Sequence, residues 1–383
     1  MPSVAIFGAG PSGCYVAQAL AKARPDADIT IFDALPVPYG LVRYGVAADH
    51  QGTKGVIRQF ERLFERQGIG FQGHVTLGRD VTLDAVRAAY DAVVLATGLS
   101  RDRRLGIPGE DLVGVHGSGA VTRAWNGFPG AEAPRMGRRV VVIGNGNVAI
   151  DLVRLLAKGA SELHGSDILI EPGAGVQDIT IVGRSPAEVA KFDPVMLKEL
   201  ARLEGCAITV SDLTGEGKVI EALDSLHGHA PAGSTKRLCF RFGLVPDRIL
   251  GTERVEGVAF ADGTVIAADT VLTAIGFDGE PGWSASDDGL LAPGLYAAGW
   301  VRRGPRGTIP ENRTDAQAIA ARIAADLPEG PGKPGLVMPG ATDYAGWQRI
   351  DAAERAAAPE GRVRAKITDH ARMLTLARQT GER

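Results

Sequence analysis

A set of glycines near the start of the chain has the spacing that binds the phosphates of a dinucleotide. Gly8, Gly10 and Gly13 follow an apolar stretch and open an Ala-rich segment, so they occupy a turn between a predicted strand and a predicted helix. The first glycine permits the sharp turn, the second lets backbone approach a pyrophosphate, and the third lets the helix pack closely on the strand. Asp33 ends the next predicted strand, where a carboxylate can accept hydrogen bonds from ribose hydroxyls. The pattern predicts a dinucleotide site; the alternative is a glycine-rich turn of an ordinary doubly wound sheet.

A second turn of the same kind lies in the middle of the chain, but it differs in the residues that end the following strand. The turn consists of Gly144, Asn145, Gly146, Asn147, Val148 and Ala149, with alanine in place of the third glycine. The next predicted strand ends at Arg184 and Ser185 instead of a carboxylate. A guanidinium and a hydroxyl can bind a 2′-phosphate, which a carboxylate would repel. This site is therefore expected to favour NADPH over NADH, unless Arg184 is only a solvated residue at a strand end.

Two dinucleotide sites in one chain indicate one cofactor that stays bound and one that exchanges. A flavin and a nicotinamide are the usual pair. A third element supports this interpretation, because a short apolar strand over 294–299 leads through Trp300 into a glycine-rich turn and a helix. The start of that helix, after Gly307, Thr308 and Ile309, could place backbone N–H groups where reduced flavin carries negative charge.

The elements that position these residues form two similar units. Each unit reads as strand, glycine turn, helix and strand, over residues 3–33 and again over 139–184. A continuous apolar strand over 90–98 and a polar connector over 99–111 separate the two units. Further strands are predicted at 206–210, 236–242, 254–260 and 269–277, and helices at 316–327 and from 343 onward, the last packed on the surface of the first domain. Repetition of the unit predicts an α/β protein with two nucleotide-binding domains.

Length and composition exclude several classes of protein. At 383 residues the chain exceeds one ordinary core and fits two or three domains. The formal net charge of −3 lacks the basic footprint of a nucleic-acid-binding protein, so no nucleic-acid partner is expected. No uncharged apolar stretch of about twenty residues is present, and the first residues lack the features of a secretory signal. No membrane contact is therefore expected.

The cysteines exclude two further kinds of chemistry. Cys14, Cys206 and Cys239 are far apart and form no C-x-x-C pair, so they supply neither a redox disulfide nor the ligands of an iron–sulfur cluster. This argues against a disulfide reductase of the thioredoxin-reductase kind. Each cysteine is expected to be a small buried residue in a reducing cytoplasm, which is the predicted location of the protein.

Long segments of the chain resemble the adrenodoxin reductase family, which includes the bacterial FprA-type ferredoxin–NADP reductases. The segments are LPVPYGLVRYGVAADH at 35–50, GNGNVAIDLVRLL at 144–156 and AAGWVRRGPRGTIPENRTDA at 297–316. Weaker similarities extend the resemblance over nearly the whole chain. It implies a glutathione-reductase-like fold with two Rossmann-like three-layer domains. The FAD domain would be discontinuous, with residues 1–103 and 276–383 and a helical C-terminal tail, and the NADPH domain would comprise 104–275.

The resemblance also implies the reaction. Hydride would pass from NADPH to FAD, and electrons would then leave one at a time to a [2Fe–2S] or related ferredoxin. The expected activity is that of a ferredoxin–NADP(+) reductase. Two alternatives stay open. One is the flavin subunit of a glutamate-synthase-like complex, which usually brings extra cysteine ligands, and the other is a non-catalytic module that binds FAD and NADP.

The family's site residues map onto this chain by position. Those implied for FAD are Ala9, Asp33, Leu41, Val75, Trp300, Gly307, Thr308 and Ile309. Those implied for NADP are Asn145, Gly146, Asn147, Val148, Arg184 and Glu199. His50 and Glu199 match an ionic pair near the flavin and are expected to shape the nicotinamide pocket; a structural role is the alternative for His50. Asp151 is expected near the same site, or else as a charge on a helix face.

The chain departs from the family pattern in three places. The family usually has Glu where Asp33 stands, a conservative change for a ribose contact. It commonly has two arginines where this chain has Arg184 and Ser185, so weaker discrimination against NADH is expected. The chain is also shorter than typical members, near 205–235 and before residue 294, which affects the surface that would dock a partner.

A partner-docking surface is predicted next to the flavin. An acidic ferredoxin needs a basic landing patch, and Arg302, Arg303 and Arg306 crowd beside Trp300 in the sequence. We therefore expect these arginines to dock the ferredoxin. The alternative is a solvated run of charges with no partner.

Overall fold

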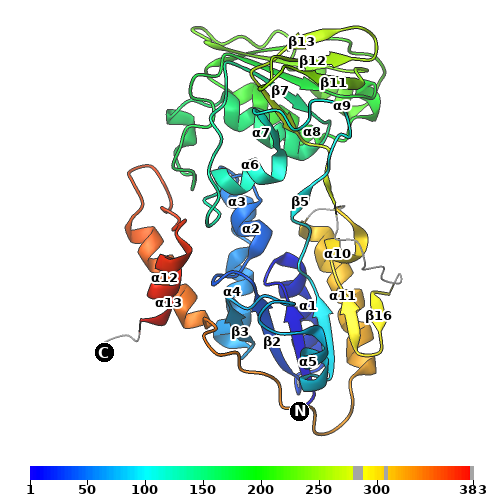
Figure 1. Cartoon of the computed structure of the whole chain (residues 1–383), viewed down its shortest axis with the longest axis vertical. Coiled ribbons are helices and arrows are strands. Elements are labelled where there is room, and N and C mark those ends of the chain that lie inside the picture. The colour runs from blue at the N-terminus through cyan, green and yellow to red at the C-terminus, as the bar shows by residue number, and fades with distance from the viewer. Residues whose placement is uncertain (279–287, 306–308, 380–383) are drawn as a thin grey trace.

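The computed structural model describes residues 1–278, 288–305 and 309–379. The chain forms two lobes stacked along the long axis, and each lobe is built around a six-stranded sheet with helices against it (Figure 1). The first lobe contains the N-terminus, and the second contains the middle of the chain. This arrangement confirms the predicted α/β class with two Rossmann-like units.

The sheet of the first lobe is assembled from both ends of the chain. Its order is β16-β17-β4-β1-β2-β3. The strands are β1 Ser3–Phe7, β2 Asp28–Asp33, β3 Gly70–Gly73, β4 Ala92–Leu95, β16 Leu290–Ala292 and β17 Leu295–Ala297. All neighbours pair in parallel except β16 with β17. Helices α1, Pro11–Ala23, and α11, Ile309–Asp326, pack against each other beside this sheet.

The sheet of the second lobe is parallel throughout and comes from one continuous stretch. Its order is β6-β14-β7-β8-β10-β9. The strands are β6 Val115–Gly117, β7 Arg139–Ile143, β8 Asp178–Val182, β9 Cys206–Val210, β10 Lys236–Arg241 and β14 Thr270–Thr273. A three-stranded antiparallel sheet covers one face, and its apolar side chains share a core with β7 and β14. It contains β11 Pro246–Leu250, β12 Gly257–Phe260 and β13 Val265–Ala267.

Short helices complete both lobes. In the first lobe they are α2 Gly40–Tyr44, α3 Gln51–Lys54, α4 Ile57–Arg66, α5 Leu83–Ala89 and α10 Trp300–Arg303. In the second they are α6 Ser118–Trp125, α7 Asn147–Ala157, α8 Pro194–Glu199 and α9 Lys218–Asp224, with 3₁₀ turns at 161–163, 187–189 and 200–202. Helix α7 is buried along most of its length because apolar residues occupy nearly all of its positions.

The chain passes between the lobes twice, and the two passages pair with each other. Strand β5, Arg101–Asp102, is antiparallel to β15, Phe277–Asp278. The connectors therefore form a short two-stranded ribbon between the lobes (Figure 1).

The C-terminal segment packs on the first lobe, as predicted. Helices α12, Tyr344–Ala356, and α13, His370–Arg378, lie beside α2, α3 and α4 in Figure 1. The rings of Tyr344 and Phe64 stack with centroids 4.6 Å apart, and Trp347 meets Tyr39 edge-on at 5.7 Å. These aromatic contacts join the tail to the core of the lobe.

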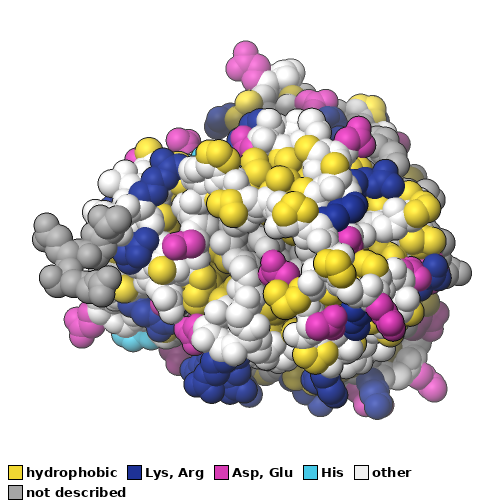
Figure 2. Space-filling model, turned by 90° about the horizontal axis from the view of Figure 1, so that it is seen from below, with side chains coloured by type: hydrophobic (Ala, Val, Ile, Leu, Met, Phe, Trp, Pro, Cys, Tyr) yellow, Lys and Arg dark blue, Asp and Glu magenta, His cyan; other side chains and the backbone are white. Residues whose placement is uncertain are grey.

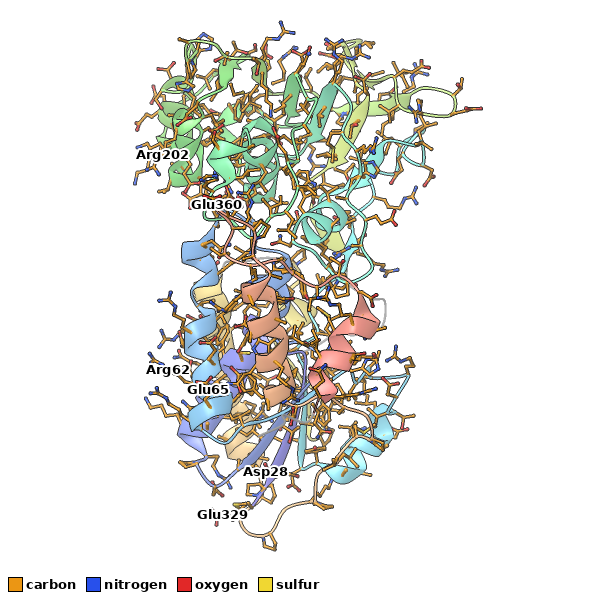
Figure 3. All side chains as sticks on the ribbon, turned by 90° about the vertical axis from the view of Figure 1, so that its left-hand side faces the viewer. Asp28, Arg62, Glu65, Arg202, Glu329 and Glu360 are labelled. Carbon is orange, nitrogen blue, oxygen red and sulfur yellow. The ribbon has the colours of Figure 1, made fainter. Side chains whose placement is uncertain are left out.

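The surface carries charges of both signs. Figure 2 shows them interspersed with apolar side chains on the lower face, and Figure 3 shows Arg62 and Arg202 pointing outward from the two lobes. Among the described residues, no helix is long and apolar enough to cross a membrane. Cys14 and Cys206 are buried as predicted, whereas Cys239 is partly exposed, and all three are free thiols.

Candidate functional site

The first glycine turn has the shape that a dinucleotide requires. Gly8 has φ +114°, and a Cβ on it would lie 2.3 Å from the carbonyl oxygen of Ala96. A Cβ on Gly13 would lie 2.0 Å from the carbonyl oxygen of Gly8, so both positions exclude any larger residue. A Cβ on Gly10 would meet no atom within 4 Å. The turn is therefore tight on its inner side and open on the side where a pyrophosphate would lie.

Asp33 is held at the end of β2 by this turn. Its carboxylate accepts hydrogen bonds from the N–H of Ala9 at 2.8 Å and from the N–H of Leu35 at 2.9 Å. Burial raises the pKa of Asp33 to about 6, although the two N–H groups oppose the shift. The carboxylate is thus fixed in orientation and ionised at neutral pH.

The second turn repeats the first in detail. Gly144 has φ +144°, and a Cβ on it would lie 2.2 Å from the carbonyl oxygen of Ala274. Ala274 follows β14 as Ala96 follows β4, so each first glycine rests on the strand next to its own. A Cβ on Gly146 would again meet no atom within 4 Å. Both turns leave the same open space beside the middle glycine.

Two buried polar atoms among the predicted site residues have no hydrogen-bond partner in the described part of the chain, and one predicted apolar residue is exposed. The Nε1 of Trp300 and the Oδ1 of Asn145 are buried and have no hydrogen-bond partner there. Leu41, on α2, has 36% of its surface exposed, which is high for a leucine beside a core. Unsatisfied buried polar atoms of this kind fit bound groups such as a flavin and a nicotinamide nucleotide.

The other residues predicted for FAD lie in different settings. Val75 is buried in a core with Phe7 and Phe32, and its N–H donates to the carbonyl of Asp33. Trp300 starts α10, and its ring lies 5.6 Å from that of Phe277. Gly307 and Thr308 lie outside the described residues, and of Ile309 only its place at the start of α11 is described.

Residues predicted for the 2′-phosphate follow β8. Arg184 is exposed and forms no ion pair with any described residue. Ser185 accepts a hydrogen bond from the N–H of Gly243 through its carbonyl, which leaves its hydroxyl available. Asn147 and Val148 begin α7, so their backbone N–H groups lie at its N-terminus, where partial positive charge favours an anion.

The predicted catalytic residues meet between the lobes. His50 precedes α3 of the first lobe, and Glu199 ends α8 of the second. The Nε2 of His50 lies 3.1 Å from Oε2 of Glu199, and its Nδ1 lies 3.7 Å from Oδ1 of Asp151. Burial raises the pKa of Asp151, while Arg154 and His50 oppose that shift. The imidazole is thus placed between two carboxylates of the opposite lobe.

Three residues of this cluster were not predicted. Arg154, on α7, has a side chain only 3% exposed, and its guanidinium lies 2.8 Å from both Asp49 and Asp151 and 3.5 Å from Glu199. The amine of Lys158 adds a second contact to Asp49 at 2.8 Å. Burial alone would raise the pKa of Asp49, but its bonds to Arg154 and Lys158 lower that pKa below its usual range. Arg154 could have been noticed in the sequence, because it is a charged residue among the mostly apolar residues of α7.

The predicted docking arginines are partly engaged within the lobe. Arg302 and Arg303 have side chains 17% and 20% exposed, and both form ion pairs with Asp315 of α11. Arg303 also donates to Oδ1 of Asn312 at 2.7 Å. Arg306 lies outside the described residues.

A groove on the first lobe contains none of the predicted site residues. It has a volume of about 580 Å³ and lies along α1, with Tyr15, Lys22 and Arg313 among its lining residues. The predicted site residues lie instead at the two turns and in the cluster around His50.

Comparison with known proteins agrees with this geometry. A family model described as pyridine nucleotide-disulphide oxidoreductase matches residues 2–205. The cindoxin reductase of Citrobacter braakii is 42% identical, with 100% of this chain and 93% of that protein aligned. The NADPH-ferredoxin reductase FprA of Mycobacterium tuberculosis is 33% identical, with 97% of this chain and 98% of that protein aligned.

Solved structures give the same result. The structure of Mycobacterium tuberculosis FprA in complex with NADPH superposes with a TM-score of 0.87 at 30% identity, over 98% of this chain and 100% of that chain. A thioredoxin reductase from Lactococcus lactis shares the fold, with a TM-score of 0.53 at 19% identity over 85% of this chain and 99% of that chain.

Proposed function

The chain belongs to the pyridine nucleotide-disulphide oxidoreductase family and, within it, to the FprA-type ferredoxin–NADP reductases, and we propose from this premise how its residues carry out the reaction. It is an NADPH-dependent flavoprotein reductase with FAD and NADPH as cofactors and a ferredoxin-type protein as electron acceptor. FAD, when bound, would supply the capacity to take up hydride from a nicotinamide and to pass on electrons. The protein supplies position, exclusion of water and electrostatic support.

One observation carries the proposal. Two glycine turns of the same geometry lie on separate lobes, and the pair of His50 and Glu199 joins those lobes at 3.1 Å. Such a pair supports a site in which a group held by the first lobe meets a group held by the second. We assign His50 and Glu199 to shaping the pocket for the nicotinamide and Asp151 to holding the imidazole.

The assignment of the two turns follows from what ends the next strand. We assign the first turn to FAD, because the fixed carboxylate of Asp33 suits ribose hydroxyls and not a 2′-phosphate. The predicted contacts from Ala9, Leu41, Val75, Trp300 and the start of α11 belong to this site. We assign the second turn to NADPH, with Arg184 and Ser185 at the 2′-phosphate. The FAD domain would then comprise 1–103 and 276–383, and the NADPH domain 104–275.

The proposed docking surface for the ferredoxin contains the arginines that follow Trp300. Arg302, Arg303 and Arg306 follow Trp300 within six residues of the sequence, and Asp315 forms ion pairs with Arg302 and Arg303. We propose that this surface receives an acidic ferredoxin. Charge reversal of Arg303 to Glu should lower the rate of ferredoxin reduction and flatten its dependence on salt, measured against cytochrome c reduction in the same preparation. An unchanged rate and salt dependence would remove the docking assignment.

Free thiols support a reducing compartment, so we place the protein in the cytoplasm as part of this proposal.

A direct experiment tests the central claim. Purified protein should be yellow, and anaerobic NADPH should bleach it within seconds, as followed by absorbance in a stopped-flow instrument. Addition of a ferredoxin should then restore the colour. A flavin that stays oxidised in excess NADPH would show a binding module and not a reductase.

A further inference from the structure

A lysine that no prediction singled out lies against the second glycine turn. The N–H of Lys191 donates to the carbonyl of Asn145 at 2.9 Å, and Lys191 forms a parallel bridge with Gly146. Two residues later the N–H of Asp193 donates to Oδ1 of Asn147 at 2.7 Å. The segment 191–193 thus runs along the turn like a short neighbouring strand.

The pairing fixes the side on which the lysine side chain begins. Gly146 has extended backbone, with φ −120° and ψ 174°, and a Cβ on it would enter open space. Residues that face each other in a parallel pair direct their side chains to the same side. The stem of Lys191 therefore starts on the side of the open space beside Gly146.

The charge of Lys191 is available to a ligand. Its side chain is exposed and forms no ion pair with any described residue. The carboxylate of Asp193, two residues on, accepts a hydrogen bond from the N–H of Val195 at 2.8 Å and forms no ion pair with Lys191. A flexible lysine beside a phosphate-binding turn is a mobile point charge with three donors.

We propose that Lys191 binds the diphosphate of the pyridine nucleotide, while Arg184 and Ser185 bind its 2′-phosphate. This inference rests on the proposed assignment of the second turn to NADPH. Each of the two cations then binds a different phosphate group of the nucleotide. Lys191 holds a group that NADPH and NADH share, and Arg184 holds the group that distinguishes them. Binding strength and coenzyme preference are therefore set by different residues.

The division of labour can be tested by equilibrium binding to the oxidised, FAD-loaded protein. Calorimetry would compare Lys191→Met and Arg184→Ala with the wild type for four probes: NADP⁺, NAD⁺, ADP and 2′-AMP. ADP carries the diphosphate alone, and 2′-AMP carries the 2′-phosphate alone. Lys191→Met should weaken NADP⁺, NAD⁺ and ADP by a common factor of about fivefold to twentyfold and leave 2′-AMP unchanged. Arg184→Ala should weaken NADP⁺ and 2′-AMP only.

Two further variants serve as controls for the effect of the Lys191 charge. Lys191→Arg should keep ADP affinity within about twofold of the wild type, because it keeps the charge. Lys218→Met removes another exposed lysine of the same lobe and should leave all four affinities unchanged.

Three results would overturn the inference. They are unchanged ADP binding in Lys191→Met, equal losses for ADP and 2′-AMP in that variant, and a matching loss in Lys218→Met. Failure of the wild type to bind any probe would instead refute the proposed function itself, together with this inference.

Discussion

At the scale of single residues, the role proposed for Asp33 would make FAD binding depend on pH. Its carboxylate accepts two backbone N–H bonds, and burial raises its pKa to about 6. Protonation would place a hydrogen where acceptors are needed, so ribose hydroxyls would bind only the ionised form. Under the proposed assignment of the first turn to FAD, binding of FAD would be coupled to loss of a proton from Asp33.

We therefore expect FAD affinity to be constant above pH 7 and to fall below about pH 6, by up to about tenfold per pH unit. The sign follows from the raised pKa, because the charged form that binds is lost as pH decreases through that value. Quenching of flavin fluorescence on titration of the apoprotein from pH 5 to 8 measures this. Asp33→Asn should bind FAD more weakly and without the decrease below pH 6; a decrease of the same size in that variant would assign it to another group.

Glu199 supports a second prediction at this scale. Glu199→Gln removes the charge that holds His50 from the opposite lobe, so flavin reduction by NADPH should slow about threefold to tenfold, the scale of a partly exposed ion pair. Stopped-flow absorbance measures this rate at saturating NADPH. The matched control is Glu204→Gln, an exposed glutamate of the same lobe, which should reduce at the wild-type rate. Equal rates in both variants would show that the pair does not position the nicotinamide.

The sequence predicted some of these residues and missed others for a physical reason. The glycines, Asp33 and Arg184 could be proposed from the sequence because a turn and the end of the next strand are local features with fixed spacing. The contact of His50 with Glu199 came from family resemblance and matches the structure at 3.1 Å. Asp49 and Lys158 carried no signal, because the ion pairs of Asp49 with Arg154 and Lys158 depend on how the two lobes meet.

At the scale of elements, the two glycine turns separate the demands of folding from those of binding. The first glycine of each turn contacts a carbonyl of the adjacent strand, whereas the middle glycine faces open space. The first glycine is therefore required for folding, and we expect the middle glycine to be required for nucleotide binding.

Substitution in the first turn should therefore have two distinct outcomes. Gly8→Ala forces a Cβ to 2.3 Å from the carbonyl oxygen of Ala96 at φ +114°, so it should destabilise the first lobe by about 3 kcal/mol or more. Gly10→Val keeps an extended backbone and should fold normally but remain colourless. Thermal unfolding by circular dichroism and absorbance at the flavin band measure the two effects. A yellow Gly10→Val protein would mean that the pyrophosphate lies elsewhere.

The matching pair in the second turn should behave in parallel. Gly146→Val should give a folded, yellow protein that NADPH no longer reduces, because the flavin site lies in the other lobe. Gly144→Ala should be destabilised as Gly8→Ala is. Loss of bound FAD in Gly146→Val would contradict the assignment of one nucleotide to each turn.

Elements followed the sequence closely where periodicity was strong. The strands of both repeated units and the helix at the C-terminus were predicted within a few residues. Helices α2 and α3 and strand β16 were not predicted, because they are short and their apolar residues are set by tertiary contacts.

At the scale of the whole molecule, a buried polar junction joins three parts of the chain. Asp167 of the second lobe lies 2.8 Å from Nζ of Lys54 on α3 and 2.9 Å from Nζ of Lys366 in the C-terminal segment. Lys54 also donates to Asn126 at 2.6 Å. Burial would raise the pKa of Asp167, but the two ammonium groups hold it below its usual value. No local sequence pattern predicts this junction, because its residues are far apart in the sequence.

Asp167→Asn should destabilise the protein by about 3–5 kcal/mol, because it leaves two buried lysines without a counter-charge. Urea unfolding followed by tryptophan fluorescence measures the change. Adding Lys366→Met should recover part of the loss, since burial and repulsion by Lys54 already lower the pKa of Lys366. The control Asp178→Asn removes an exposed ion pair with Arg237 and should lower the free energy of unfolding by less than about 1 kcal/mol. Similar losses in the two asparagine variants would show that the junction contributes little.

The split sheet of the first lobe has a consequence for how the protein matures on the ribosome. All six strands of the second sheet lie between residues 115 and 273. The first sheet cannot be completed until β17, at residues 295–297, has been synthesised. The turn proposed for NADPH can therefore be completed during translation, while the sheet that carries the turn proposed for FAD, whose glycines emerge first, is still incomplete. Flavin should be captured late, so a released chain that ends at residue 278 should bind ADP yet leave FAD in solution.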